Sequence, residues 1–154
     1  MHIVIVPAIG TQPQSPAIGI LITVGGAVFG VLGGLHALYT LLDLRKPRRL
    51  VPVDSSVARA MSHTSLRLSG GGTDMWRAWI GFNFSHGLGV VFLAVLAIWT
   101  GTRMRVVPVA LVVTLTLTGC IYLALALLYW FRIPAIGVAV GTICFAAALV
   151  LSIR

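Results

Sequence analysis

Four long stretches of this chain contain no Asp, Glu, Lys or Arg, and this feature constrains the fold more than any other. Each is longer than the roughly 18 apolar residues that a helix needs to cross a bilayer. Lipid offers no hydrogen-bonding partner, so the backbone of such a segment must satisfy its own polar groups, as an α-helix does. The sequence therefore predicts transmembrane helices at 16–42, 78–102, 106–131 and 133–153.

Composition supports an all-α membrane protein. Of the 154 residues, 58% are hydrophobic and 9% are charged, whereas soluble domains have about 25% charged residues. The short connections after the second and third helices make successive helices neighbours, which predicts a single antiparallel four-helix transmembrane bundle over residues 1–154. Residues 1–10 are apolar but too short to span and lack the basic start of a signal peptide, so we expect an interfacial tail there.

The distribution of basic residues predicts the orientation. Cytoplasmic loops near helix ends carry an excess of Lys and Arg. Eight of the eleven basic residues fall on the side of the 43–76 loop, and three fall on the other side. This asymmetry places the 43–76 loop in the cytoplasm and both termini outside. The eight are Arg45, Lys46, Arg48, Arg49, Arg59, Arg67, Arg77 and Arg132, and the three are Arg103, Arg105 and Arg154.

The net charge of +8 indicates a membrane surface that faces anionic lipids. Nucleic acid is the weaker interpretation, because no basic domain with interleaved aromatic residues lies outside the bilayer. The basic run 45–49 ends the first helix, where cations suit the negative end of the helix dipole. A positive-inside anchor is favoured there over a specific phosphoinositide-type site.

The middle of the loop has the pattern of a short amphipathic helix over 54–68, with Asp54 as its N-cap. Its apolar face would lie flat on the cytoplasmic membrane surface while its basic face meets lipid headgroups. The apolar face contains Val57, Met61, Thr64 and Leu68, and the basic face contains Arg59, His63 and Arg67.

Three glycines at 70–72 precede the second transmembrane helix and allow a sharp turn. Thr73 or Asp74 then caps that helix with a side-chain oxygen. An alternative is that the glycine amides, Arg67 and Arg77 cradle an anion. Asp74 argues against it, because its carboxylate would occupy the same positive helix end. At the helix entry we expect lipid-headgroup contacts from Trp76, Arg77 and Trp79.

Small residues recur at the spacing that lets transmembrane helices approach closely, in three of the four predicted helices. This pattern predicts either packing within the bundle or a homodimer face. The expected packing positions are Gly26, Gly30 and Gly34 in the first helix, Gly81, Ser85 and Gly89 in the second, and Gly137 and Gly141 in the fourth.

Polar residues at one depth form the candidate site. His36 lies nine residues before Arg45 and His86 lies nine after Arg77, so each is about 13 Å from the cytoplasmic helix end at a rise of 1.5 Å per residue. Intramembrane polar groups either fasten helices to each other or form a working site. The predicted layer consists of His36, Tyr39, Asn83, Ser85, His86, Tyr122 and Thr142.

Three interpretations of this layer stay open. The favoured one is structural: each imidazole bonds a facing polar group and sets helix register. The second is a haem or a quinone bound through His36 and His86, and the third is a proton or small-solute pathway. No cofactor is firmly assigned, and the identity of any metal is unknown.

Enzyme templates are absent from the sequence. It contains no CxxC, HExxH, GxSxG or phosphate-loop pattern. Cys120 and Cys144 reach similar depth, so a disulfide in the membrane is conceivable, but packing as small apolar residues is favoured. We therefore expect a non-catalytic accessory or structural membrane component, either as a homo-oligomer or in a larger membrane complex.

The run Gly-Gly-Gly-Thr-Asp-Met-Trp-Arg-Ala-Trp-Ile-Gly-Phe-Asn-Phe-Ser-His-Gly-Leu-Gly occupies residues 70–89. Together with Val57, Met61 and Thr64, it resembles an uncharacterised family of short four-helix bacterial integral membrane proteins. The resemblance covers about residues 51–90. It implies a bacterial origin and a shared architecture, and it brings no activity, ligand or catalytic residue.

Overall fold

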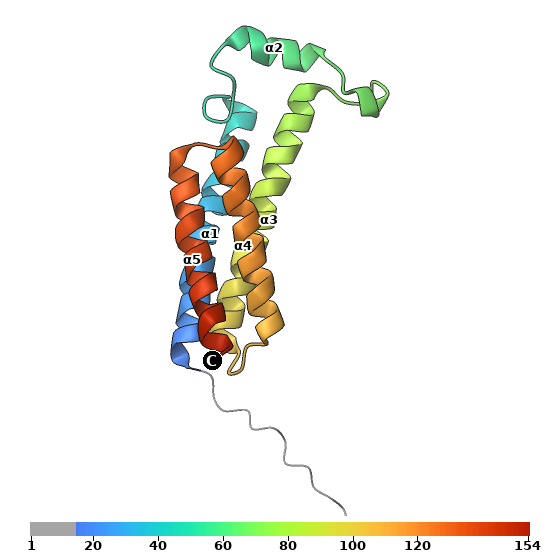
Figure 1. Cartoon of the computed structure of the whole chain (residues 1–154). Coiled ribbons are helices and arrows are strands. Elements are labelled where there is room, and N and C mark those ends of the chain that lie inside the picture. Colours follow the sequence, from blue (N-terminus) through green and yellow to red (C-terminus); the bar gives the residue numbers. More distant parts are fainter. Residues whose placement is uncertain (1–14) are drawn as a thin grey trace, which may run out of the picture. The chain divides into compact units, whose positions relative to one another are not determined.

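The computed structural model describes residues 15–154, and the predicted tail at 1–10 lies outside this range. Apart from one isolated bridge between Ser65 and Asp74, the regular structure of the described residues is helical (Figure 1). The elements are α1 (Pro16–Arg45), α2 (Ser55–His63), the 3-10 turn η1 (Arg67–Ser69), α3 (Met75–Arg103), α4 (Val109–Tyr129) and α5 (Arg132–Ser152).

Four of these helices, α1, α3, α4 and α5, are long and apolar enough to cross a membrane. They correspond to the four predicted spans, with ends displaced by up to three residues. The start of α4 moves from 106 to Val109, since the residue before Pro108 is disfavoured in helical conformation. α3 begins three residues earlier than predicted, directly after its cap at Asp74.

The surface of these helices is apolar and several buried positions are polar. Ile20, Phe92 and Leu127 are 62%, 72% and 69% exposed, whereas Asn83 and Thr142 are buried. A soluble protein would expose such a continuous apolar surface only at a cost in free energy. This distribution is compatible with an integral membrane protein whose helices face lipid.

Contacts divide the described chain into two compact units. The first unit contains residues 15–28 and 94–154, and the second contains residues 29–93. α1 and α3 contribute residues to both units. Each unit is described by itself below, and the expectation of a single membrane domain stays a prediction.

Close packing of small residues characterises the first unit. A Cβ atom added to Gly19 would lie 2.6 Å from the carbonyl oxygen of Gly101, so α1 and α3 are in backbone contact there. A Cβ atom on Gly26 would lie 2.9 Å from that of Ala97. α4 and α5 also pack together, with Gly119 against the side chain of Thr142.

In the second unit, α1 and α3 are also in close contact. A Cβ atom on Gly33 would lie 2.8 Å from Cβ of Val90, and one on Gly87 would lie 3.0 Å from the backbone nitrogen of Ala37. The Gly33 and Gly87 contacts were not among the packing positions expected from the sequence.

Some of the expected small-residue packing positions make no close contact between helices within the described chain. Gly34, Gly81 and Gly89 have no atom beyond the backbone of their own helix within 4 Å of an added Cβ, and Ser85 is exposed. The alternative of a homodimer face at these positions stays a prediction. On α3 the face in contact with α1 carries Asn83, Gly87 and Val90 instead. Of the other expected positions, Gly26 and Gly141 are buried, and Gly30 and Gly137 are half-buried.

The helix predicted over 54–68 is shorter than expected and ends at His63. After it, the Leu66 amide donates to the Thr73 carbonyl and the Met75 amide donates to the Thr64 carbonyl, at 3.2 and 2.8 Å. The chain leaves the helix because it pairs with the segment that enters α3. Leu68 therefore lies in η1, where it is fully exposed.

Asp54 caps α2, as the sequence predicts: its Oδ1 accepts a hydrogen bond of 2.7 Å from the Ser56 amide. This bond holds the pKa of the Asp54 carboxyl below its usual value. In Figure 1, α2 runs across the loop-side ends of α1 and α3 within the second unit.

Both cysteines are free thiols, with Cys120 exposed and Cys144 half-buried.

Candidate functional site

Three residues of the predicted polar layer come together in the second unit. His36 on α1 and Asn83 on α3 form a hydrogen bond of 3.1 Å between Nε2 and Oδ1. The His36 and His86 rings touch edge to face, with centroids 5.2 Å apart and planes at 75°. Asn83 is buried, and both imidazoles are half-buried.

These contacts follow from helical spacing. Asn83 and His86 are three residues apart on α3, so their side chains lie on the same face of that helix. Gly87, next to His86, brings the α3 backbone close to Ala37, next to His36. The absence of a side chain at Gly87 is therefore what lets the polar groups of the two helices meet.

A hydrogen-bonded path runs from Asn83 toward the loop. The Asn83 amide nitrogen Nδ2 donates to the Trp79 carbonyl at 2.8 Å, and the Trp79 indole nitrogen donates to the Leu50 carbonyl at 2.8 Å. On the other side, the ring of Phe82 stacks on His86 with centroids 6.0 Å apart. Trp79, expected to contact lipid headgroups, thus also ties the loop to α3.

The remaining residues of the predicted layer make other contacts or belong to the first unit. The ring of Tyr39 lies beneath the guanidinium of Arg49, with Cζ 5.2 Å from the ring centre. Ser85 donates to the Phe82 carbonyl of its own helix at 3.0 Å. Tyr122 and Thr142 belong to the first unit, where Thr142 donates to the Val138 carbonyl at 2.7 Å.

Asp43 is a feature of this unit that the sequence analysis missed. Its side chain is 1% exposed and accepts four backbone hydrogen bonds of 2.6–3.2 Å from Arg48, Arg49 and Leu50. The signal in the sequence was an acidic residue near the C-terminal end of a helix, where the helix dipole disfavours negative charge. Such a residue needs compensating donors.

The entry to α3 is a turn with a helix cap. Gly70 and Gly71 have φ of 56° and 94°, a region that glycine adopts without strain. Asp74 accepts a hydrogen bond of 2.8 Å from the Arg77 amide. The Asp74 carboxylate therefore occupies the positive end of the helix. Thr73 pairs through its backbone with Leu66, Trp76 is half-buried, and Arg77 is exposed.

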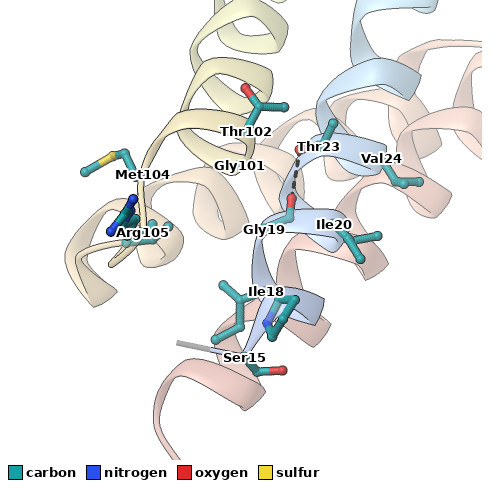
Figure 2. A pocket seen from close by; sticks show the side chains of 12 residues that line it. Ser15, Ile18, Gly19, Ile20, Thr23, Val24, Gly101, Thr102, Met104 and Arg105 are labelled. Carbon is teal, nitrogen blue, oxygen red and sulfur yellow. Dashed lines mark hydrogen bonds between the residues drawn. The ribbon is translucent and has the colours of Figure 1, made fainter. Parts of the chain in front are cut away.

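A groove of about 570 Å³ lies in the first unit. The residues that line it are separate in the sequence from the polar residues described above. Figure 2 shows its walls, with Ile18, Gly19 and Ile20 from α1 and Gly101 and Thr102 from α3. The Thr23 hydroxyl, which could offer a polar contact, donates to the Gly19 carbonyl at 2.8 Å. None of the residues predicted to form a site lines this groove.

The geometry of the histidine pair bears on which ligands it can hold. Bis-histidine haem ligation requires a macrocycle between two imidazoles that point at one iron. Here the two rings are in direct contact, and His36 Nε2 is directed at Asn83. Haem therefore does not fit between the rings in this arrangement. Among residues 15–154, no group of three or more His, Cys, Asp or Glu side chains is placed to hold a metal ion.

Comparison with protein-family models, curated proteins and solved structures finds no match to this chain. The function of the site is therefore inferred from the chemistry of the second unit. That chemistry comprises an interhelical hydrogen bond, an imidazole pair, and a basic loop tied to both helices.

Proposed function

We propose that this chain is a multi-pass integral membrane protein that acts as a non-catalytic accessory or structural component of a bacterial inner membrane. In this proposal α1, α3, α4 and α5 form an antiparallel bundle, and α2 lies on the cytoplasmic surface. Both termini lie outside. The eight-to-three distribution of basic residues supports this orientation. The resemblance of residues 70–89 to a family of short four-helix bacterial membrane proteins supports the bacterial source.

The observation that carries the non-catalytic role is the hydrogen bond between His36 and Asn83. It joins α1 to α3, and Asn83 uses its amide nitrogen to bond the Trp79 carbonyl. Polar groups in hydrocarbon must find partners, and such links hold membrane helices in register. In this role the buried polar residues fasten the two helices and need no ligand.

A quinone is the second candidate, because a quinone carbonyl accepts hydrogen bonds and one of the two imidazoles could donate to it. A third is a proton pathway, favoured by the direct contact of two imidazoles. These roles make different demands on His36. Fastening needs a hydrogen-bonding side chain, whereas proton transfer needs a group that titrates.

His36→Gln and His36→Leu separate the three roles, with His63→Gln on exposed α2 as the control. If His36 fastens helices, Gln preserves the melting temperature in detergent, Leu lowers it, and the protein carries no quinone. Stoichiometric quinone extracted from the parent but not from His36→Gln would overturn this role. So would proton flux in proteoliposomes that the parent supports and His36→Gln lacks.

Topology is tested with reporter fusions. Alkaline phosphatase fused at residue 154 should be active, and the same enzyme inserted between residues 50 and 70 should be inactive. The reverse pattern would contradict the orientation and place the basic loop outside.

A further inference from the structure

The loop that follows α1 concentrates positive charge. Arg45, Lys46, Arg48 and Arg49 fall within five residues, and all four are exposed. A positive-inside anchor needs only such charges and no particular loop conformation. The structure adds a defined conformation that this general role leaves unexplained.

Asp43 imposes that conformation. A buried carboxylate is costly unless hydrogen bonds satisfy it, and an ionised carboxylate has about four acceptor sites. Asp43 receives four bonds from three consecutive backbone amides, at residues 48, 49 and 50. Its acceptor sites are therefore used by the backbone, and the side chains of the loop cations remain at the surface.

Two further contacts hold the loop. The Trp79 indole donates to the Leu50 carbonyl, which ties the end of the loop to α3. The Arg49 guanidinium lies over the Tyr39 ring of α1, a cation–π contact that restricts this cation. The basic residues are therefore arranged on a segment held to α1 at Asp43 and Tyr39 and to α3 at Trp79.

We propose that this loop, residues 45–49 held by Asp43, binds the phosphate of an anionic phospholipid headgroup. Arg and Lys are the donors that phosphate oxygens accept from, and a fixed loop presents them without a large ordering cost. The proposal rests on the membrane location proposed above, which puts the end of α1 at the headgroup level. Charge complementarity favours an anionic over a zwitterionic lipid.

Native mass spectrometry of the detergent-purified protein, titrated with phosphatidylglycerol or phosphatidylcholine, tests the proposal. The decisive variant is Asp43→Asn, which raises the net charge from +8 to +9. Simple attraction predicts equal or tighter lipid binding. A site organised by Asp43 predicts about tenfold weaker phosphatidylglycerol binding, equivalent to 1.4 kcal/mol. Asp54→Asn is the matched control, with the same charge change at an exposed position, and should bind as the parent does.

A second pair of variants tests the proposal even if Asp43→Asn does not fold. Arg49→Gln and Arg59→Gln each remove one exposed charge, in the loop and on α2. The proposal expects weaker phosphatidylglycerol binding for Arg49→Gln only. Equal binding by the two variants, or no preference of the parent for phosphatidylglycerol, would overturn it. Displacement of the lipid by equimolar inorganic phosphate would make the loop a soluble-anion site and would also overturn it.

Failure of this inference differs from failure of the proposed function. If carbonate washing extracts the parent chain from membranes, the membrane location is wrong. If the chain resists carbonate but shows no preference for anionic lipid, the membrane location stands and the headgroup site is rejected.

Discussion

Both units of this molecule join α1 to α3 through close contacts at glycine, and the second unit adds a polar link between the two helices. In the first unit, Gly19 and Gly101 bring two backbones into contact, and hydroxyls such as those of Thr23 and Thr142 bond carbonyls of their own helices. In the second, Gly87 brings the α3 backbone against Ala37 of α1, and a hydrogen bond between His36 and Asn83 also links the two helices. Between apolar helices in lipid there is no hydrophobic driving force, so close packing and polar links are the available means.

The comparison shows where chemistry can reside. A contact between glycine backbones is tight but presents no reactive group. The polar contact in the second unit brings imidazole, amide and indole groups together and continues into a loop with four exposed cations. We therefore place the candidate site in the second unit, and the following substitutions compare the glycine contacts of the first unit with the polar link of the second.

The largest effect is expected for Gly101→Ala in the first unit. An added Cβ would meet the Thr23 hydroxyl and would lie 2.5 Å from the Gly19 carbonyl oxygen. Such overpacking typically lowers the free energy of unfolding by about 1–3 kcal/mol. Gly81→Ala is the control, because its added Cβ meets open space. Thermal unfolding in detergent should separate the two variants, and equal melting temperatures would refute backbone contact at Gly101.

Asn83→Leu should have a smaller effect in the second unit. It removes the acceptor that His36 uses while keeping a similar side-chain volume. Interhelical polar links in membranes average about 0.6 kcal/mol and reach about 1.7 kcal/mol, so the loss of unfolding free energy should fall in this range. Ser85→Ala, at an exposed position bonded within α3, should leave stability unchanged.

A double-mutant cycle with His36→Leu and Asn83→Leu sharpens this prediction. If the two side chains bond each other, the double variant should lose less stability than the sum of the single variants. Strict additivity would mean that the His36–Asn83 bond contributes nothing to helix association.

Trp79→Phe should act locally on the loop. It removes the indole donor to the Leu50 carbonyl but retains the aromatic ring. A single hydrogen bond contributes about 0.5–1.5 kcal/mol, so amide exchange at residues 48–50 should accelerate up to about tenfold. Trp99→Phe, at an exposed position of the first unit, is the control. Unchanged exchange at 48–50 would show that the Trp79 hydrogen bond does not hold the loop.

The smallest effect concerns α2 and depends on pH. The Ser56 amide lowers the pKa of Asp54, so the contribution of this cap is complete above the unfolded-state value near 3.9. It is lost as the pH falls through the lower folded-state value. Asp54→Ala should speed exchange of the Ser56 amide at neutral pH, measured by NMR. The difference from the parent should diminish in acid, and a difference that persists there would contradict a charged cap.

The positions of the long helices could be predicted because runs without charge have to be helical in lipid. Their ends depended on local chemistry that the apolar pattern did not contain. α1 continues to Arg45 past the acidic Asp43, α3 begins at its Asp74 cap, and α4 begins after Pro108. α2 ended early because Thr64 pairs with Met75, which lies 11 residues further along the chain.

The candidate site was predicted in part. Equal depth of His36 and His86 followed from the rise of a helix, and the structure places their rings in contact. Depth does not determine direction around the helix axis, so Tyr39 and Ser85 were grouped with them although their side chains contact other groups. Asp43 was missed because its partners are backbone amides, which have no side-chain signature in the sequence.

By itself the sequence determined that this chain has four helices long and apolar enough for a membrane, and that His36 and His86 hold matching positions along two of them. Those properties depend on composition and on the fixed rise of an α-helix. The tertiary structure decided which helix faces are in contact, with Gly87 rather than Gly81 against α1. In lipid both the packed and the exposed faces of a helix are apolar, so hydrophobicity cannot distinguish them, and only the fit between two backbones can.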